Sequence, residues 1–103
     1  MRKLILGAGK NQRIEGAEHH DQYPFPGIDH VFDLNGNWFP EGLKEGYNLI
    51  TCDHVIEHLH SLTNFMNNCH MILKPDGWLE LTTPTALSIR VMTLSTGSTM
   101  ILL

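Results

Sequence analysis

Residues 47–83 restrict the fold of this chain more than any other stretch, because they place a helical pattern between two strand-like runs. The runs are YNLITC (47–52) and WLELTT (78–83). Between them, apolar residues recur at three- and four-residue intervals, which is one stripe of an amphipathic helix. The stripe consists of Leu59, Leu62, Phe65, Met66, Cys69, Ile72 and Leu73. Strand, helix and strand in this order predict a βαβ unit, and therefore a parallel sheet with a right-handed crossover.

Both ends of the expected helix carry residues with known positional preferences. Ser61 is predicted to be the N-cap, because a serine hydroxyl can accept a hydrogen bond from a free N–H group of the first turn. The segment KPDG (74–77) supplies a basic residue, a proline that cannot continue the helix and a glycine suited to its end. The helix is therefore expected to stop at this segment.

The residues before this unit contain three more apolar runs. Residues 3–8 read as a buried strand that ends in the turn Gly7-Ala8-Gly9. Residues 14–20 are weakly strand-like and end in Asp21, and residues 28–34 form a brief third run. The sequence thus predicts an α/β fold with an open, mainly parallel sheet of about five strands and few helices.

The connections between these runs are short. Only four residues separate Gly9 from Ile14, although parallel neighbours normally need a dozen or more residues between them. The first connection must therefore be an abbreviated loop without a crossover helix. Residues 40–46, PEGLKEG, have room for at most one helical turn.

Composition excludes several classes of protein. A chain of 103 residues holds one small domain. Its formal net charge of -4 and its seven Lys and Arg residues predict neither a nucleic-acid partner nor an anionic membrane partner. No run is apolar enough to span a bilayer, and the N-terminal apolar run is too short for a secretion signal. Two cysteines without a C-x-x-C pair argue against a disulfide framework and favour a cytoplasmic location.

A strand that ends in Gly-x-Gly, followed by a carboxylate at the end of the next strand, suits a nucleoside cofactor. Glycines let the backbone approach the ligand, and the carboxylate can accept hydrogen bonds from two ribose hydroxyls. Gly7, Gly9 and Asp21 fit these roles. The turn alone is weak evidence, since any tight turn after a strand can use glycine.

Three short sequence motifs in a fixed order are a more specific signal than the glycine turn alone. They are LILGAG (4–9), HVIEHL (54–59) and LKPDG (73–77). In these phrases the chain resembles the class I S-adenosylmethionine-dependent methyltransferases, in the group that carries phrases such as LNLGCG, HVLEHL and LKPGG. The resemblance covers residues 3–84 and implies a Rossmann-like fold, S-adenosylmethionine as cofactor and methyl transfer to a small-molecule or unknown acceptor.

The resemblance also implies roles for individual residues around the cofactor. Gly7 and Gly9 would line its methionine portion, and Asp21 would hold the ribose. Asp33 would accept a hydrogen bond from the adenine amino group, with the Leu34 backbone beside the ring. The cofactor-binding residues implied in this way are Gly7, Ala8, Gly9, Asp21, Asp33, Leu34, Cys52 and Asp53.

Residues after the fourth strand would face the transferred methyl group. The resemblance places Cys52, Asp53 and His54 beside the sulfonium and the acceptor. A general base is needed only if the acceptor must lose a proton, and the candidates are Asp53, His54 and His58. The histidines are favoured, because the ordinary pKa of histidine lies near working pH.

The chain departs from the family pattern at several positions. Lys10-Asn11-Gln12 follows the glycine turn where the family usually has an acidic residue or a third glycine. The usual aspartate at the start of the fourth strand is Asn48, and one glycine of LKPGG is Asp76. Family members also end in two more strands that form an antiparallel edge.

The last residues predict a different ending for this chain. The methyltransferase-like core is expected to span residues 1–84, and residues 85–103 are expected to form a short helix or tail without the antiparallel strands. Two explanations compete: either the chain is a truncated or frame-disrupted relative, or a second copy covers its exposed apolar surface. A parallel sheet buries both faces and one helix cannot cover both, so the sequence predicts a homo-oligomer.

The stretch DHVIEHLH (53–60) also contains H-x-x-E-H, the pattern of a family of zinc proteases. There, His54 and His58 would bind zinc and Glu57 would activate water, with a third protein ligand that is usually a glutamate far downstream. Only Glu80 follows, inside a strand-like run, so no metal site is predicted. The hypotheses are therefore a methyltransferase, an inactive cofactor-binding remnant or scaffold, and, less favoured, a zinc hydrolase.

Overall fold

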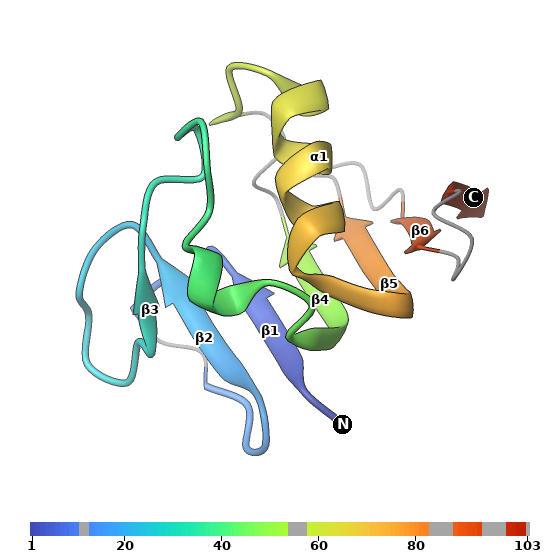
Figure 1. Ribbon diagram of the computed structural model, residues 1–103. Coiled ribbons are helices and arrows are strands. Elements are labelled where there is room, and N and C mark those ends of the chain that lie inside the picture. Colours follow the sequence, from blue (N-terminus) through green and yellow to red (C-terminus); the bar gives the residue numbers. More distant parts are fainter. Residues whose placement is uncertain (11–12, 54–57, 83–87, 94–98, 103) are drawn as a thin grey trace.

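The strands that the structure describes form one twisted sheet with a helix packed across one face (Figure 1). This computed structural model describes residues 1–10, 13–53, 58–82, 88–93 and 99–102. The two helices are η1, a single 3-10 turn (Glu41–Leu43), and α1 (Leu62–Ile72). The strands are β1 (Lys3–Leu6), β2 (Glu18–Asp21), β3 (His30–Val31), β4 (Tyr47–Asp53), β5 (Leu73–Thr82), β6 (Ser88–Thr93) and β7 (Thr99–Leu102).

The first five strands are parallel, and their spatial order is β3-β2-β1-β4-β5. The chain starts in the middle of this sheet, moves outward to β3 and returns on the other side of β1 as β4. The order therefore reverses between β1 and β4, and ligands of open α/β sheets bind beyond the carboxyl ends of strands at such a point. The predicted βαβ unit and the mainly parallel, Rossmann-like sheet are confirmed.

The expectation of a short helix or tail after residue 84, without antiparallel strands, is wrong, because the described residues Ser88–Thr93 and Thr99–Leu102 form strands. β6 pairs antiparallel with β5, and β7 pairs antiparallel with β6. The sheet therefore has an antiparallel edge, which was not predicted from the sequence. Alternation explains the pairing: Val91 is buried and Ile89 packs against the core, while Arg90 lies on the opposite face, 3.6 Å from Glu80. This alternation was not recognised in the sequence, because Pro84 and the polar residues around it precede β6 and interrupt the apolar pattern.

Helix α1 begins as predicted. The Oγ atom of Ser61 accepts a hydrogen bond from the backbone N–H of Asn64 at 3.2 Å. The buried residues of α1 fall on one stripe and are Phe65, Asn68, Cys69 and Ile72. No described helix is long and apolar enough to cross a bilayer.

The end of α1 differs from the prediction. The helix stops at Ile72, and β5 starts immediately, so the Lys74–Gly77 segment lies in an irregularity of the sheet where the register shifts. Asp76 adopts a φ of 66°, a left-handed conformation that favours glycine. A glycine at this position, as in the phrase LKPGG of the family that the sequence resembles, would adopt this backbone more easily than an aspartate.

The hydrophobic core lies between the sheet and the segments on its helical face. Its members from the sheet alternate along each strand, as a half-buried strand requires. The fully buried hydrophobic side chains from the sheet are Leu4, Leu6, Tyr47, Ile50, Cys52 and Leu79, and the helical face contributes Phe39, Phe65, Cys69 and Ile72. Both cysteines are free and buried.

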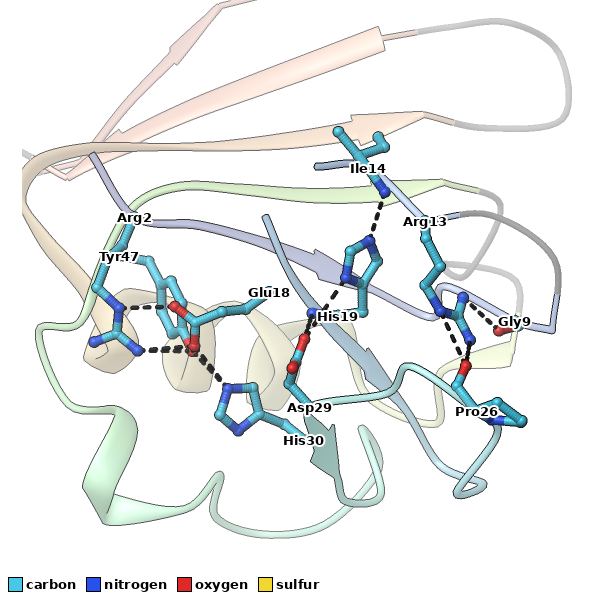
Figure 2. A network of polar contacts seen from close by, with 10 residues as sticks. All are labelled: Arg2, Gly9, Arg13, Ile14, Glu18, His19, Pro26, Asp29, His30 and Tyr47. Atoms are coloured by element: carbon cyan, nitrogen blue, oxygen red, sulfur yellow. Dashed lines mark hydrogen bonds and ion pairs between the residues drawn. The ribbon is translucent and has the colours of Figure 1, made fainter. Parts of the chain in front are cut away.

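A polar network closes the opposite end of the sheet, at the amino ends of the strands (Figure 2). Glu18 accepts hydrogen bonds from Arg2 Nε at 2.8 Å and from the Tyr47 hydroxyl at 2.8 Å, and its carboxylate lies 2.8 Å from His30 Nε2. The Arg2 hydrogen bond is the largest cause that lowers the pKa of Glu18 to about 2. This network joins β2, β3 and β4 to the residue before β1, and it leaves the carboxyl ends of the strands for a ligand.

Candidate functional site

A cavity of about 170 Å³ opens at the carboxyl ends of β1 and β2. Its lining includes Gly7, His20, Asp21, Asp33, Leu34 and His58. Pockets for complete ligands usually measure roughly 300–1,000 Å³, so this cavity has room for one part of a larger molecule. The structure therefore brings together five residues implicated by the sequence, namely Gly7, Asp21, Asp33, Leu34 and His58.

The glycine turn after β1 is held by β2. Gly7 and Gly9 have φ angles of 67° and 73°, which residues with a Cβ rarely adopt. The N–H of Gly7 donates to His20 Nδ1 at 3.2 Å, that of Ala8 to the His20 carbonyl at 2.8 Å and that of Gly9 to Asp21 Oδ2 at 2.9 Å. These three N–H groups are therefore already used inside the protein, so they are not free to bind a phosphate.

Asp21 is a buried carboxylate at the edge of the cavity. Its Oδ2 accepts from Gly9, and its Oδ1 accepts from the N–H of Tyr23 at 3.1 Å. An ionised carboxylate offers about four lone-pair positions. Asp21 therefore fixes the glycine turn and keeps acceptor capacity for hydroxyl groups of a ligand.

The loop after β3 forms the second wall. The exposed Asp33 carboxylate accepts from the N–H of Asn35 at 2.9 Å, while Leu34 packs against the core. The Asn35 side chain reaches the segment before α1: its Oδ1 accepts from the N–H of His60 at 2.8 Å, and its Nδ2 donates to the His58 carbonyl at 3.3 Å. Asn35 thus places His58 at the cavity, a role that the sequence analysis missed.

Two more asparagines attach this loop to α1. Asn64 Nδ2 donates to the Gly36 carbonyl at 3.0 Å, and Asn68 Nδ2 donates to the Asn37 carbonyl at 3.3 Å. Asn64 and Asn68 are four residues apart and share one side of the helix. That spacing, beside the apolar stripe, was the available signal, because a buried amide such as Asn68 needs a partner.

An arginine supports the turn from the side of the abbreviated first connection (Figure 2). Arg13 Nη1 donates to the Gly9 carbonyl at 3.0 Å, and Arg13 Nη2 donates to the Pro26 carbonyl at 2.6 Å. Nearby, the N–H of Ile14 donates to His19 Nε2 at 2.9 Å. The described residues of this connection, 10 and 13–17, contain turns and no helix, as predicted.

The arrangement of a glycine turn, two acidic strand ends and a mainly parallel sheet agrees with the relatives of the sequence. A sequence profile of the methyltransferase domain matches residues 9–98. The chain belongs to this methyltransferase family. A bovine relative, the mitochondrial ubiquinone biosynthesis O-methyltransferase of Bos taurus, is 30% identical over 76 residues. The matched region is 71% of this chain but 20% of that protein.

Solved methyltransferase structures share the fold. The CMeT domain of the citrinin polyketide synthase superposes with a TM-score of 0.60 at 21% identity, over 79% of this chain and 28% of that one. An S-adenosylmethionine-dependent methyltransferase from Mesorhizobium loti gives a TM-score of 0.60 at 16% identity, over 80% of this chain and 46% of the other. This methyltransferase domain thus spans less than half the length of these relatives.

Of the described residues expected near the transferred methyl group, only His58 lines the cavity. The Cys52 side chain lies in the core of the methyltransferase domain, and burial is the main cause that raises the pKa of its thiol to about 12. This side chain therefore does not face the cavity, and a contact through its backbone stays a prediction. Asp53 is exposed at the end of β4 and does not line the cavity, whereas His58 does. His54 lies outside the described residues.

The zinc pattern receives no support from the described part of the chain. His54 and Glu57 of H-x-x-E-H are not described. Among the residues that are, no group of three or more His, Cys, Asp or Glu side chains is arranged to hold a metal ion. The resemblance gives these letters another interpretation, in which HVIEHL matches the phrase HVLEHL after the fourth strand.

Proposed function

We propose that this chain binds S-adenosylmethionine at the cavity and transfers its methyl group to an acceptor. The hydrogen bonds of the glycine turn carry the proposal. Because the N–H groups of Gly7, Ala8 and Gly9 are bound to His20 and Asp21, the turn suits a nucleoside without phosphates better than a dinucleotide. Carboxylates at Asp21 and Asp33 suit a ligand that carries hydroxyls, an amino group and a positive sulfur.

The residues around the cavity divide the cofactor between them. Asp21 would accept hydrogen bonds from the ribose hydroxyls, and Asp33 with Leu34 would contact the adenine. The turn at Gly7 and Gly9 would lie along the methionine portion. A cavity of about 170 Å³ then encloses part of the cofactor, and the remainder extends along the carboxyl ends of β1 and β4.

The cofactor supplies a methyl group that is already activated by its sulfonium. The protein therefore has to align donor and acceptor and to exclude water. If the acceptor loses a proton, His58 is the candidate base that lines the cavity, and Asp53 and His54 are the other candidates. These roles rest on the family and on the positions of Asp53 and His58 at the same end of the sheet.

Calorimetry with S-adenosylhomocysteine, the demethylated product, tests the cofactor. We expect saturable binding, and we expect adenosine diphosphate to bind at least about tenfold more weakly, because the N–H groups that would hold its phosphates are occupied. The two ligands share their adenosine, so their difference isolates the phosphate argument. No heat and no thermal shift with millimolar S-adenosylhomocysteine would overturn the proposal.

Turnover separates an active enzyme from an inactive cofactor-binding remnant. The names of the similar proteins point to different acceptor atoms. The bovine protein is an O-methyltransferase, and another similar structure is the CurJ carbon methyltransferase. A screen with methyl-labelled S-adenosylmethionine should therefore include phenols and acidic carbon compounds. Cofactor binding without any labelled product would favour the remnant.

We also propose that a second copy covers the sheet face opposite α1, here called the open face. Both described helices lie on one side of the sheet (Figure 1), whereas parallel sheets are usually covered on both. On the open face the apolar side chains of Ile5 and Leu49 are partly exposed beside Thr51, and a hollow of about 140 Å³ is lined by Leu49 and Trp78 together with the charged Glu80 and Arg90. Apolar surface of this kind is typical of a contact between subunits.

Substitution of Thr51 by arginine tests self-association. Light scattering at micromolar concentration should give a dimeric or larger mass for the native chain, and Thr51→Arg should give a monomeric mass, because a charge in an apolar contact is costly to bury. Thr63→Arg, on the exposed side of α1, is the matched control and should keep the native mass. A monomeric native chain would remove the proposal.

A further inference from the structure

His20 joins the two walls of the cavity through both nitrogens of its ring. The side chain is 1% exposed and lies on β2. Its Nδ1 is 3.2 Å from the N–H nitrogen of Gly7, and its Nε2 is 2.8 Å from the carbonyl oxygen of Phe32. Gly7 lines the cavity on one side, and Phe32 directly precedes Asp33 and Leu34, which line it on the other.

The two partners determine the protonation state of the ring. A backbone N–H can only donate, so Nδ1 must carry a lone pair, and a carbonyl oxygen can only accept, so Nε2 must carry the proton. His20 is therefore neutral, with its proton on Nε2, whenever both bonds are made. The Phe32 ring packs against the imidazole, with the two ring centroids 4.1 Å apart.

From this geometry we infer that His20 is a positioning residue for the cofactor. Its neutral ring holds the glycine turn and the loop after β3 at the separation that the cofactor needs. Protonation of the ring releases the turn. The inference rests on the proposed cofactor site. A second proton on Nδ1 would face the N–H of Gly7, so the bond would be replaced by repulsion between two donors. The result would be a cofactor site that weakens in acid.

The net effect of the groups around the ring is to favour its neutral state. Burial is the largest influence and lowers the pKa of His20, and the Phe32 carbonyl and the Asp21 carboxylate act in the opposite direction. His30 on β3 adds to the lowering, and Asp33 and His58 are the other titratable groups at the same cavity. Since the unfolded chain takes up this proton first, stability falls as the pH drops below the ordinary value of 6.5.

Calorimetry across pH with a matched variant tests the inference. S-adenosylhomocysteine should bind the native chain about fivefold to tenfold more weakly once the ring is protonated, at the acid pH that its NMR titration defines, than at about pH 8, the effect of one lost hydrogen bond. In His20→Asn the side-chain oxygen can still accept from Gly7 but cannot take up a proton, so this difference should disappear. The ligand titrates identically in both proteins, and His70→Asn, an exposed change on α1, should retain the native pH dependence.

Nitrogen NMR of the ring gives a second test that needs no ligand. The ¹⁵N shifts of His20 should show a proton on Nε2 and none on Nδ1, and the Gly7 amide should shift as the ring titrates. A proton on Nδ1, or an acid-induced loss of binding that persists in His20→Asn, would overturn the inference. If the native chain fails to bind S-adenosylhomocysteine even at about pH 8, the cofactor proposal fails, and the NMR result alone decides the role of His20.

Discussion

Phe65→Ala should lower the free energy of unfolding by about 3–5 kcal/mol, the usual cost of removing a buried aromatic ring. Phe65 is fully buried and attaches α1 to the sheet. Its ring meets Phe39 edge-on at 6.2 Å, and Phe39 meets Phe32 at 4.9 Å between centroids. Since small domains are stable by about 5–15 kcal/mol, this one change should remove a large part of the total.

Denaturant unfolding, followed by circular dichroism, measures this loss. Leu62→Ala is the matched control, because Leu62 lies one turn earlier on α1 and is 49% exposed. It should change stability by no more than about 0.5 kcal/mol. Equal losses in the two variants would mean that α1 does not pack on the sheet through Phe65.

The aromatic row also connects this prediction to the cavity. Phe32 stacks beside His20, so the row runs from α1 through Phe39 and Phe32 to the imidazole that holds the glycine turn. Removal of the Phe65 ring leaves an empty space beside Phe39, so the end of the row that lies on α1 loses its support. Phe65→Ala should therefore weaken cofactor binding as well, although Phe65 does not line the cavity.

The central βαβ unit was predictable because its signals are local and agree with one another. The apolar run of β4, the stripe of α1 and the Ser61 cap all act within a few residues along the chain. The end of α1 was not predicted correctly, because Lys74–Gly77 can end a helix or form a bulge with equal ease. The bulge forms because β5 pairs with Tyr47 and Leu49 of β4 on either side of it. Pairing between strands is not visible in a local sequence pattern.

The antiparallel edge was missed for a related reason. β6 alternates Ile89, Arg90 and Val91, but a run this short has little helical or strand preference of its own. Its conformation comes from pairing with β5, whose unpaired edge would otherwise be left open. The same limit applies to His20, since its partners Gly7 and Phe32 come from segments that only the fold brings together.

Asp21→Ala should weaken the binding of S-adenosylhomocysteine by about 1.5–3 kcal/mol, or roughly 10- to 150-fold, because it removes charge-assisted hydrogen bonds. Two losses combine in this variant. The ribose loses its acceptor, and the N–H groups of Gly9 and Tyr23 lose the carboxylate that fixes them. Calorimetry at a temperature where circular dichroism shows the variant folded separates weaker binding from unfolding.

Asp21→Asn distinguishes the two losses, since an amide keeps one oxygen acceptor but carries no charge. If Asp21 acts mainly on the ligand, the asparagine variant should bind almost as weakly as the alanine variant but lose less stability, because its single oxygen keeps one of the two hydrogen bonds to Gly9 and Tyr23. If the carboxylate serves only the turn, stability should fall in Asp21→Ala and affinity should follow stability in both variants. Glu15→Ala, an exposed change in the first connection, should leave both quantities unchanged. Native affinity in a folded Asp21→Ala would contradict the ribose contact, because the carboxylate that lines the cavity at the end of β2 would then contribute nothing to binding.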